Sequence, residues 1–158
     1  MNIFYLDKKI QFCAQYHCDK HVVKMVLEYA QILCTVLHES GKEAAYRATH
    51  KKHPCTIWAG ESLDNWLWLS KLCYAVNAEY QFRFEHDTPH KSAIVVSSLD
   101  LPELPSLRIT ERPQAMPDKY KVADNPVSAY RNYYLGEKQH LLKYTKRGLP
   151  YWAGDSYL

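Results

Sequence analysis

A row of polar side chains recurs at helical spacing inside a segment that is otherwise apolar. Its members, spaced four, three, four, three and four residues apart, are His17, His21, Lys24, Glu28, Gln31 and Thr35. At about 100° per residue they share one narrow face of a helix, with Lys20 at its edge, and apolar residues cover most of the rest. Because unpaired buried charges are costly, this row must face water, a ligand or polar partners.

The row has three interpretations. It is a solvated outer face if Lys24 and Glu28 simply pair at i and i+4. It is a metal site if His17 and His21, at the same spacing, reach one ion together with a third ligand. It is a metal-free acid–base or nucleophile site if it faces an enclosed space.

We adopt the third interpretation. Lys24 lies between His21 and Glu28, and a desolvated lysine can attack a sugar C1′ and form a Schiff base. Glu28 or a histidine would then move protons. The catalytic residues expected on this basis are Lys24, Glu28, His17 and His21, with no cofactor and no metal.

Basic and aromatic residues elsewhere suit nucleic-acid binding. Basic side chains outnumber acidic ones by eight to five over residues 1–54 and by nine to five over residues 108–158, but number three against seven over residues 55–107. Two basic ends brought together would form a positive surface for phosphates. The expected nucleic-acid-binding residues are Lys20, Lys51, Lys52, His53, Arg131, Lys143 and Arg147 at phosphates, and Trp68, Tyr130 and Tyr133 stacked on a base. A solvated loop for residues 49–54 and core packing for Trp68 are the competing interpretations.

Two long helices would position these groups. Apolar periodicity predicts one helix over residues 14–37 and a second that opens at Pro54 and runs towards residue 84. Residues 3–6 form a short strand or an extended lead-in, and residues 90–99 form either helix or strand. Residues 100–124, with four prolines, are expected to be irregular.

A third helix is signalled by Asn125 as N-cap and Pro126 at the first helical position. It is expected to reach residue 135, bend at Gly136 and resume to about residue 145, before an extended aromatic tail over residues 148–152. The expected fold is mainly α: a single compact domain over residues 1–158 with two long core helices, a long irregular Pro-containing connection and a C-terminal helical segment.

Composition limits the class of protein further. The 158 residues are 47% hydrophobic and 23% charged, as in globular proteins, and their apolar runs are shorter than the roughly 20 residues of a membrane helix. The five cysteines form no C-x-x-C pair, which favours free thiols in a reducing compartment. We therefore expect a cytoplasmic protein that makes no membrane contact.

Several short segments of the sequence resemble those of a family of small, largely uncharacterised tailed-phage proteins. These segments are Met-Asn-Ile-Phe-Tyr-Leu-Asp at 1–7, Cys-Asp-Lys-His-Val-Val-Lys-Met at 18–25, His-Pro at 53–54, Pro-Gln-Ala-Met-Pro at 113–117 and Ala-Tyr-Arg-Asn-Tyr-Tyr at 129–134. This resemblance covers nearly the whole chain. It implies a phage setting, and hence the cytoplasm of a host cell, but no activity.

The order of elements also resembles the phage pyrimidine-dimer DNA glycosylase/AP-lyase family, which are small all-α enzymes. The similar parts are the short apolar start, the helix opening at residues 14–17, the His-Pro at 53–54 that leads the second helix, and the basic-aromatic ending at 146–152. The resemblance implies an N-terminal amine as nucleophile, a glutamate and a histidine on the first long helix, and basic residues that bend DNA and flip a nucleotide. The histidine falls on His17.

This sequence departs from that family at two positions. The family's catalytic glutamate falls on Lys24, with Glu28 one turn later, and removal of Met1 is disfavoured by the large side chain of Asn2. Lys24 is therefore the expected amine and Glu28 the expected carboxylate. The expected function is that of a DNA glycosylase-like enzyme, with AP-lyase activity an added possibility, acting on the N-glycosidic bond of a damaged or modified pyrimidine in DNA.

Three alternatives stand beside this expected function. One is an enzyme that processes a nucleotide or a modified pyrimidine in phage DNA metabolism. Another is a non-catalytic phage protein that binds DNA or a host factor, and the last is a metal-dependent nuclease. The expected partner is DNA or a nucleotide.

Overall fold

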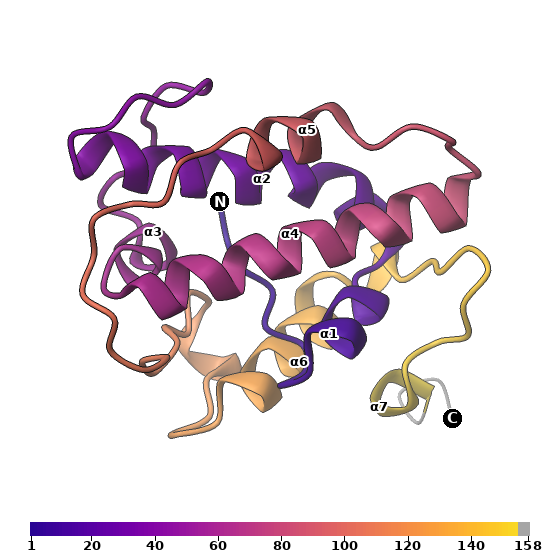
Figure 1. Cartoon of the computed structure of the whole chain (residues 1–158). Helices are drawn as coiled ribbons and strands as arrows, with labels where there is room; N and C mark the ends of the chain where they lie inside the picture. The colour runs from indigo at the N-terminus through magenta and orange to yellow at the C-terminus, as the bar shows by residue number, and fades with distance from the viewer. Residues whose placement is uncertain (155–158) are drawn as a thin grey trace.

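A computed structural model describes residues 1–154, which are mainly helical and contain no strand (Figure 1). The α-helices are α1 (Ile10–Tyr16), α2 (Asp19–Glu39), α3 (Pro54–Ala59), α4 (Leu63–Phe84), α5 (Lys91–Ser97), α6 (Pro126–Glu137) and α7 (Tyr151–Gly154). Two short 3₁₀ helices, η1 (Asp118–Tyr120) and η2 (Gln139–Leu141), flank α6. The expected mainly α class is confirmed.

The two long helices α2 and α4 pack against each other and form the centre of the molecule (Figure 1). Helix α1 lies on α4, while α3 and α5 lie on α2. Fully buried side chains such as Tyr29, Leu33, Leu69 and Val76 fill the space between them. This rigid pair therefore supplies the frame on which polar groups can be held at fixed distances.

The helix expected over residues 14–37 is in fact two helices, because the chain is extended at His17 and Cys18. The expectation that it begins at residue 14 and runs unbroken is wrong. Tertiary hydrogen bonds replace the helical ones here: Arg83 Nη1 donates to the His17 carbonyl at 2.7 Å, and the Cys18 amide donates to the Tyr134 hydroxyl at 3.3 Å. No glycine or proline marks this break in the sequence.

The second long helical stretch is also interrupted. Helix α3 ends before Gly60, and α4 begins after Ser62, whose hydroxyl accepts a hydrogen bond from the Asn65 amide at 3.1 Å and caps the helix. The segment over residues 90–99 forms helix α5 and no strand. The break at residues 60–62 therefore adds two helix ends to a region in which apolar periodicity had indicated one continuous element.

Helix α6 begins where expected, with the Asn125 side chain accepting from the Ser128 amide at 3.1 Å and Pro126 at the first position. Its expected resumption to residue 145 is wrong, because only the single turn η2 follows. Position 136 requires glycine, because the ring of Tyr120 occupies the space that a Cβ atom would fill. The tail expected to be extended over residues 148–152 instead enters the helical turn α7.

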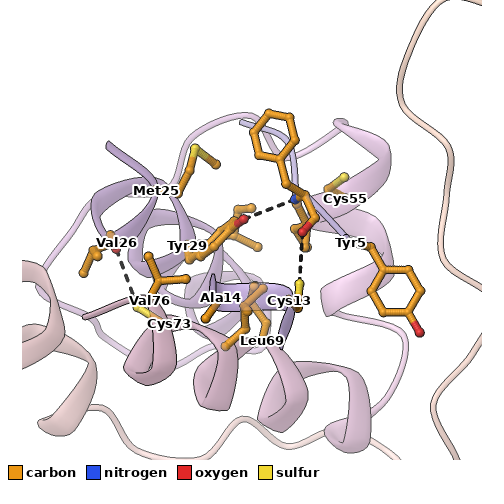
Figure 2. Close-up of a cluster of buried hydrophobic side chains, with 14 of the residues drawn as sticks. Tyr5, Cys13, Ala14, Met25, Val26, Tyr29, Cys55, Leu69, Cys73 and Val76 are labelled. Atoms are coloured by element: carbon orange, nitrogen blue, oxygen red, sulfur yellow. Dashed lines mark hydrogen bonds between the residues drawn. The ribbon is translucent and has the colours of Figure 1, made fainter. Parts of the chain in front are cut away.

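The first six residues form an extended segment that passes through the core rather than a strand. Side chains satisfy its backbone groups (Figure 2): the Phe4 amide donates to the Tyr29 hydroxyl at 3.1 Å, and the Phe4 carbonyl accepts from the Cys13 thiol at 3.2 Å. The Leu6 carbonyl accepts from Arg131 Nε at 2.9 Å. Buried backbone polar groups need such partners, so this segment is held in one conformation.

None of the helices in residues 1–154 combines the length and the apolar character needed to cross a bilayer.

Candidate functional site

A pocket of about 280 Å³ lies between the N-terminal segment, the middle of α2 and the end of α6. Its lining residues are Met1, Asn2, Phe4, His21, Lys24, Met25, Glu28, His53, Ala115, Tyr133 and Lys138. Two amines meet a carboxylate there, and we refer to it as the amine pocket. Three members of the polar row of α2 therefore line the same pocket.

Glu28 is the carboxylate of the amine pocket, and two amines flank it. Its Oε1 lies 2.6 Å from the α-amine of Met1, whose side chain is 5% exposed. Its Oε2 lies 3.5 Å from Lys24 Nζ, yet this buried oxygen makes no hydrogen bond. The Lys24 side chain is 66% exposed, so its amine is the more mobile of the two. The unsatisfied Oε2 is available to a ligand or to a proton in transfer.

Asn2 fixes the position of the α-amine. Its side-chain amide donates to the Ala115 carbonyl at 2.8 Å, and its Oδ1 accepts from the Tyr130 hydroxyl at 2.8 Å and from the Cys55 thiol at 3.3 Å. These partners come from three separate parts of the chain. The residue after Met1 is thus clamped, and the α-amine is held against Glu28 by the fold and not by the ion pair alone.

His21 lines the amine pocket as a neutral imidazole. Burial, with smaller contributions from His17 and nearby cations, lowers the pKa of His21 to about 3. Its ring stacks on Phe4 with centroids 4.3 Å apart, and its Nδ1 shares a hydrogen bond of 2.6 Å with the Tyr134 hydroxyl. A ring held in this way can donate or accept a hydrogen bond without adding charge.

The amine pocket carries a net positive charge near neutral pH. The α-amine of Met1, Lys24 and Lys138 are cationic, whereas Glu28 is the single carboxylate among the lining residues. His53 adds no charge, because burial, followed by the nearby α-amine, lowers its pKa. A pocket with this balance attracts anionic ligands, of which phosphate esters are the commonest in nucleic-acid chemistry.

His17, expected among the catalytic residues, does not reach the amine pocket. It lies at the break between α1 and α2, fully buried, where its Nδ1 donates to the Cys13 carbonyl at 2.7 Å and its Nε2 accepts from the Tyr29 hydroxyl at 2.7 Å. Burial lowers the pKa of His17 to about 4. Both ring nitrogens are thus occupied, and His17 serves the packing of α2 against the N-terminal segment.

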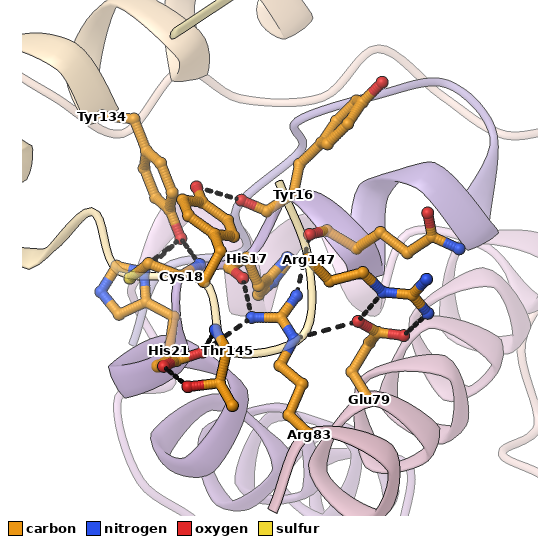
Figure 3. A network of polar contacts seen from close by, with 12 residues as sticks. Tyr16, His17, Cys18, His21, Glu79, Arg83, Tyr134, Thr145 and Arg147 are labelled. Carbon is orange, nitrogen blue, oxygen red and sulfur yellow. Dashed lines mark hydrogen bonds and ion pairs between the residues drawn. The ribbon is translucent and has the colours of Figure 1, made fainter. Parts of the chain in front are cut away.

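A network of buried charges surrounds that break (Figure 3). Arg83, 2% exposed, donates through Nε to Glu79 at 3.0 Å and through Nη1 to Asp19 at 3.2 Å. Arg147 binds Glu79 through two nitrogens at 3.0 and 2.8 Å, and Thr145 donates to Asp19. We call these five residues the charge network. Every charge in the charge network has an opposite partner. The network links α2, α4 and the C-terminal segment, because its residues come from all three.

The residues expected at phosphates are distributed over several regions. His53 lines the amine pocket, and Lys20 and Lys143 lie exposed at the start of α2, where the Asp19 amide donates to the Lys143 carbonyl at 2.8 Å. Lys51 instead pairs with Glu39 at 3.0 Å, and Lys52 lies exposed beside it.

The other two expected phosphate ligands are arginines that already have protein partners. Arg147 belongs to the charge network, and Arg131 pairs with Asp7 at 3.0 Å and donates to the Leu6 carbonyl. Both therefore hold the chain together, and neither presents an unpaired guanidinium to a ligand.

The three aromatic residues expected to stack on a base also differ. Tyr133 lines the amine pocket and remains partly exposed. Trp68 and Tyr130 are 7% and 1% exposed, and their rings pack in the core. The competing interpretation of Trp68 as a core residue therefore matches its position.

Within residues 1–154, no group of three His, Cys, Asp or Glu side chains is arranged to hold a metal ion. Five of the lining residues were expected from the sequence, and the other six are Met1, Asn2, Phe4, Met25, Ala115 and Lys138. The N-terminal amine was implied only by the glycosylase resemblance, and Lys24 was expected in its place. Phe4 belongs to an apolar run, and Lys138 follows a helix end without any recognisable motif.

Comparisons with known proteins give no further guide. No protein family, no curated protein and no solved structure was found to match this chain. The geometry of the amine pocket is therefore the basis for a functional assignment.

Proposed function

We propose that the protein is a DNA glycosylase-like enzyme, with lyase activity at abasic sites, that uses an amine beside Glu28 as its nucleophile. The observation that carries the proposal is the 2.6 Å contact between the α-amine of Met1 and Glu28 in a positively charged pocket that is open to solvent on one side. Amines that form Schiff bases need a neighbouring group that takes their proton. The pocket supplies both groups within contact distance.

Of the two amines, the α-amine of Met1 fits the role better than Lys24. It is closer to Glu28 and is clamped through Asn2, whereas the Lys24 side chain extends into solvent. A nucleophile gains most from being held in place before reaction. In this assignment Lys24 acts as a cation at the mouth of the pocket, in place of the nucleophile expected from the sequence.

The proposed chemistry begins with proton transfer from the α-amine to Glu28. The neutral amine bonds to C1′ of the nucleotide, while the bond from C1′ to the base breaks and the base leaves with the electron pair and takes up a proton. The product is a glycosylamine, whose C1′–O4′ bond then breaks as O4′ takes up a proton, and this ring opening leaves an iminium ion between the protein and C1′. Removal of a C2′ proton from this ion breaks the C3′–O bond, which is the lyase step, and water then releases the sugar fragment.

Nucleic acid is the proposed substrate because unpaired cations line this pocket and the start of the same helix. Lys20, Lys138 and Lys143 make no ion pair within residues 1–154, and Lys20 precedes Lys24 by one turn of α2. Phosphate contacts by lysines supply much of the affinity of proteins for DNA. His21 and Tyr133 line the same pocket and can contact a base or sugar held there. The distant resemblance to the pyrimidine-dimer glycosylase family supports the same class of substrate.

Borohydride trapping on an abasic duplex tests the proposal. Reduction of an iminium ion links protein and DNA permanently, so the native protein is expected to give a covalent adduct. A variant with one extra glycine before Met1 displaces the α-amine and is expected to lose the adduct. Lys24→Ala is expected to retain it, and Glu28→Gln to form it more slowly.

The outcomes separate the alternatives. An adduct that survives the extra glycine but disappears in Lys24→Ala contradicts the α-amine assignment and makes Lys24 the nucleophile. Trapping on a free nucleotide and not on DNA indicates a nucleotide-processing enzyme. If no adduct forms on abasic or damaged DNA or on nucleotides, the enzymatic proposal fails, and non-catalytic binding is the function that remains.

A further inference from the structure

Arg112 is a partly buried cation that has no carboxylate partner within residues 1–154, and it lies away from the amine pocket. Its guanidinium carbon is 3.8 Å from the ring centre of Tyr5, 4.3 Å from that of Trp68 and 5.2 Å from that of Trp58. Its Nε is fully buried without a hydrogen-bond partner, and among residues 1–154 no carboxylate pairs with it. Aromatic faces stabilise a guanidinium but leave the N–H groups at its edge free.

Arg112 lines a cavity of about 600 Å³ that we call the guanidinium cavity. This cavity is separate from the amine pocket, because the extended N-terminal segment divides them: Phe4 lines the amine pocket, whereas Tyr5 lines the guanidinium cavity. Figure 2 shows the Tyr5 side chain directed away from Tyr29. Successive side chains of an extended chain point to opposite sides, which explains the separation.

The other walls of the guanidinium cavity supply further donors. Lys8 and Lys9 are exposed at its rim and make no ion pair within residues 1–154. The N-terminus of α6, a helix of 12 residues, borders the cavity at Val127; Pro126 has no N–H and the Ser128 amide already donates to Asn125, so the helix contributes the Val127 amide and the positive end of its dipole, which favours an anion. Thus donors from three directions face the same space.

Carboxylates are also present in the guanidinium cavity, but they do not neutralise Arg112. Asp7 pairs with Arg131 at 3.0 Å, and Glu111 and Asp124 are exposed, so their side chains can remain in solvent. An anion with oxygens in several directions would match the surrounding donors better than a flat carboxylate does. Arginine forks bind phosphate through two parallel hydrogen bonds.

We propose that the guanidinium cavity is a phosphate-binding site in which Arg112, Lys8 or Lys9 and the start of α6 hold one phosphate group. The phosphate is either a backbone phosphodiester of a nucleic acid or a free or terminal phosphate. This site is additional to the amine pocket and does not depend on the chemistry proposed there. Trp58 and Trp68 beside Arg112 provide a fluorescence signal for its occupation.

The test is titration of the full chain with inorganic phosphate, followed by tryptophan fluorescence and calorimetry. The native protein is expected to bind phosphate saturably at millimolar concentration and acetate more weakly. Arg112→Gln and Arg112→Lys are each expected to weaken phosphate binding about tenfold, because lysine keeps the charge but not the fork. Arg108→Gln, which changes an exposed arginine of the same segment, is the matched control and should leave binding unchanged.

Oligonucleotides with and without a 5′-phosphate distinguish the two sources. If Arg112→Lys weakens both equally, the site holds a backbone phosphodiester; if it weakens only the phosphorylated one, the site holds a terminal phosphate. Either result supports the proposal. Should Arg112→Gln fail to fold, Arg112→Lys and the double variant Lys8→Gln/Lys9→Gln carry the test. Unchanged binding of phosphate and of both oligonucleotides in those variants, or no saturable binding by the native protein, overturns it.

Discussion

The start and the middle of α2 lie in opposite electrostatic environments. At the start of the helix, the charge network gives every buried charge an opposite partner, and Arg83 alone contacts Asp19, Glu79 and the His17 carbonyl. One to three turns later, in the amine pocket, cations outnumber the carboxylate, and Glu28 Oε2 makes no hydrogen bond. Complete pairing stabilises a fold, whereas incomplete pairing leaves groups available to a ligand. The comparison therefore separates structural charges from those offered to a substrate.

The largest expected effect is on stability and comes from the charge network at the start of α2. Arg83→Met should lower the free energy of unfolding by about 3–5 kcal/mol, because it leaves Asp19 and Glu79 buried without their shared partner. Urea denaturation followed by circular dichroism measures this loss. Arg108→Met, at an exposed position, is the control and should change stability by less than about 0.5 kcal/mol. A loss below 1 kcal/mol in Arg83→Met would contradict the structural role of the network.

On the unpaired side, Glu28→Gln should affect activity far more than stability. Loss of the group that takes the amine proton should slow formation of the trapped adduct by about 10²- to 10⁴-fold. The same variant should lose about 1–2 kcal/mol, less than Arg83→Met, since the Lys24 contact is exposed on one side and the α-amine, although it loses its partner, remains clamped through Asn2. If Glu28→Gln unfolds as easily as Arg83→Met, Glu28 is a structural charge and the comparison fails.

Acid should destabilise the protein through its buried neutral imidazoles. Burial lowers the pKa of His21 to about 3, whereas in the unfolded chain it is near 6.5, so between these values the unfolded state binds the extra proton. Stability is therefore complete above pH 6.5 and falls as the pH is lowered. Over the interval from pH 6.5 to 5 this amounts to about 2 kcal/mol for one imidazole.

Thermal melts across that pH interval, in His21→Gln and the native protein, measure the contribution. His21→Gln should reduce the dependence on pH, while His140→Gln, which changes an exposed histidine, should leave it unaltered. Equal slopes for His21→Gln and native protein would show that His21 titrates normally in the folded state.

The smallest expected effect concerns DNA affinity. Lys138→Gln removes one unpaired cation of the amine pocket and should weaken DNA binding a few-fold while reducing the slope of log K against log salt by about one. Fluorescence anisotropy at several salt concentrations gives both quantities. Lys71→Gln, on the exposed side of α4, serves as the matched control. If both variants gave the same result, the amine pocket would not be the place where the DNA phosphates bind.

Local signals in the sequence were sufficient to predict where some helices begin. Asn125 and Pro126 specify the start of α6 because an N-cap and a fixed φ act within one turn. The break at His17 and Cys18 could not be predicted, because its hydrogen bonds come from Arg83 and Tyr134, which are more than 60 residues away. Helical spacing therefore predicted correctly that a polar row exists on α2, but placed His17 on it.

The same limit applies to the amine pocket. Lys24 and Glu28 lie on one helix, so their spacing was informative. The contact between Met1 and Glu28 requires Asn2 to meet Tyr130 and Ala115, which no local pattern reveals. Charge counts likewise indicated basic ends but could not show that Arg147 and Arg131 are already neutralised by Glu79 and Asp7.

The buried course of residues 2–6 also has a consequence for how the chain is made. Asn2 binds Tyr130 and Leu6 binds Arg131, so the opening segment acquires these partners only after α6 has left the ribosome. Contacts of such long sequence separation slow folding, and domains that depend on them complete their structure late. Residues 2–6 are thus expected to be among the last parts of the described chain to become ordered, because their partners lie more than 120 residues later in the sequence.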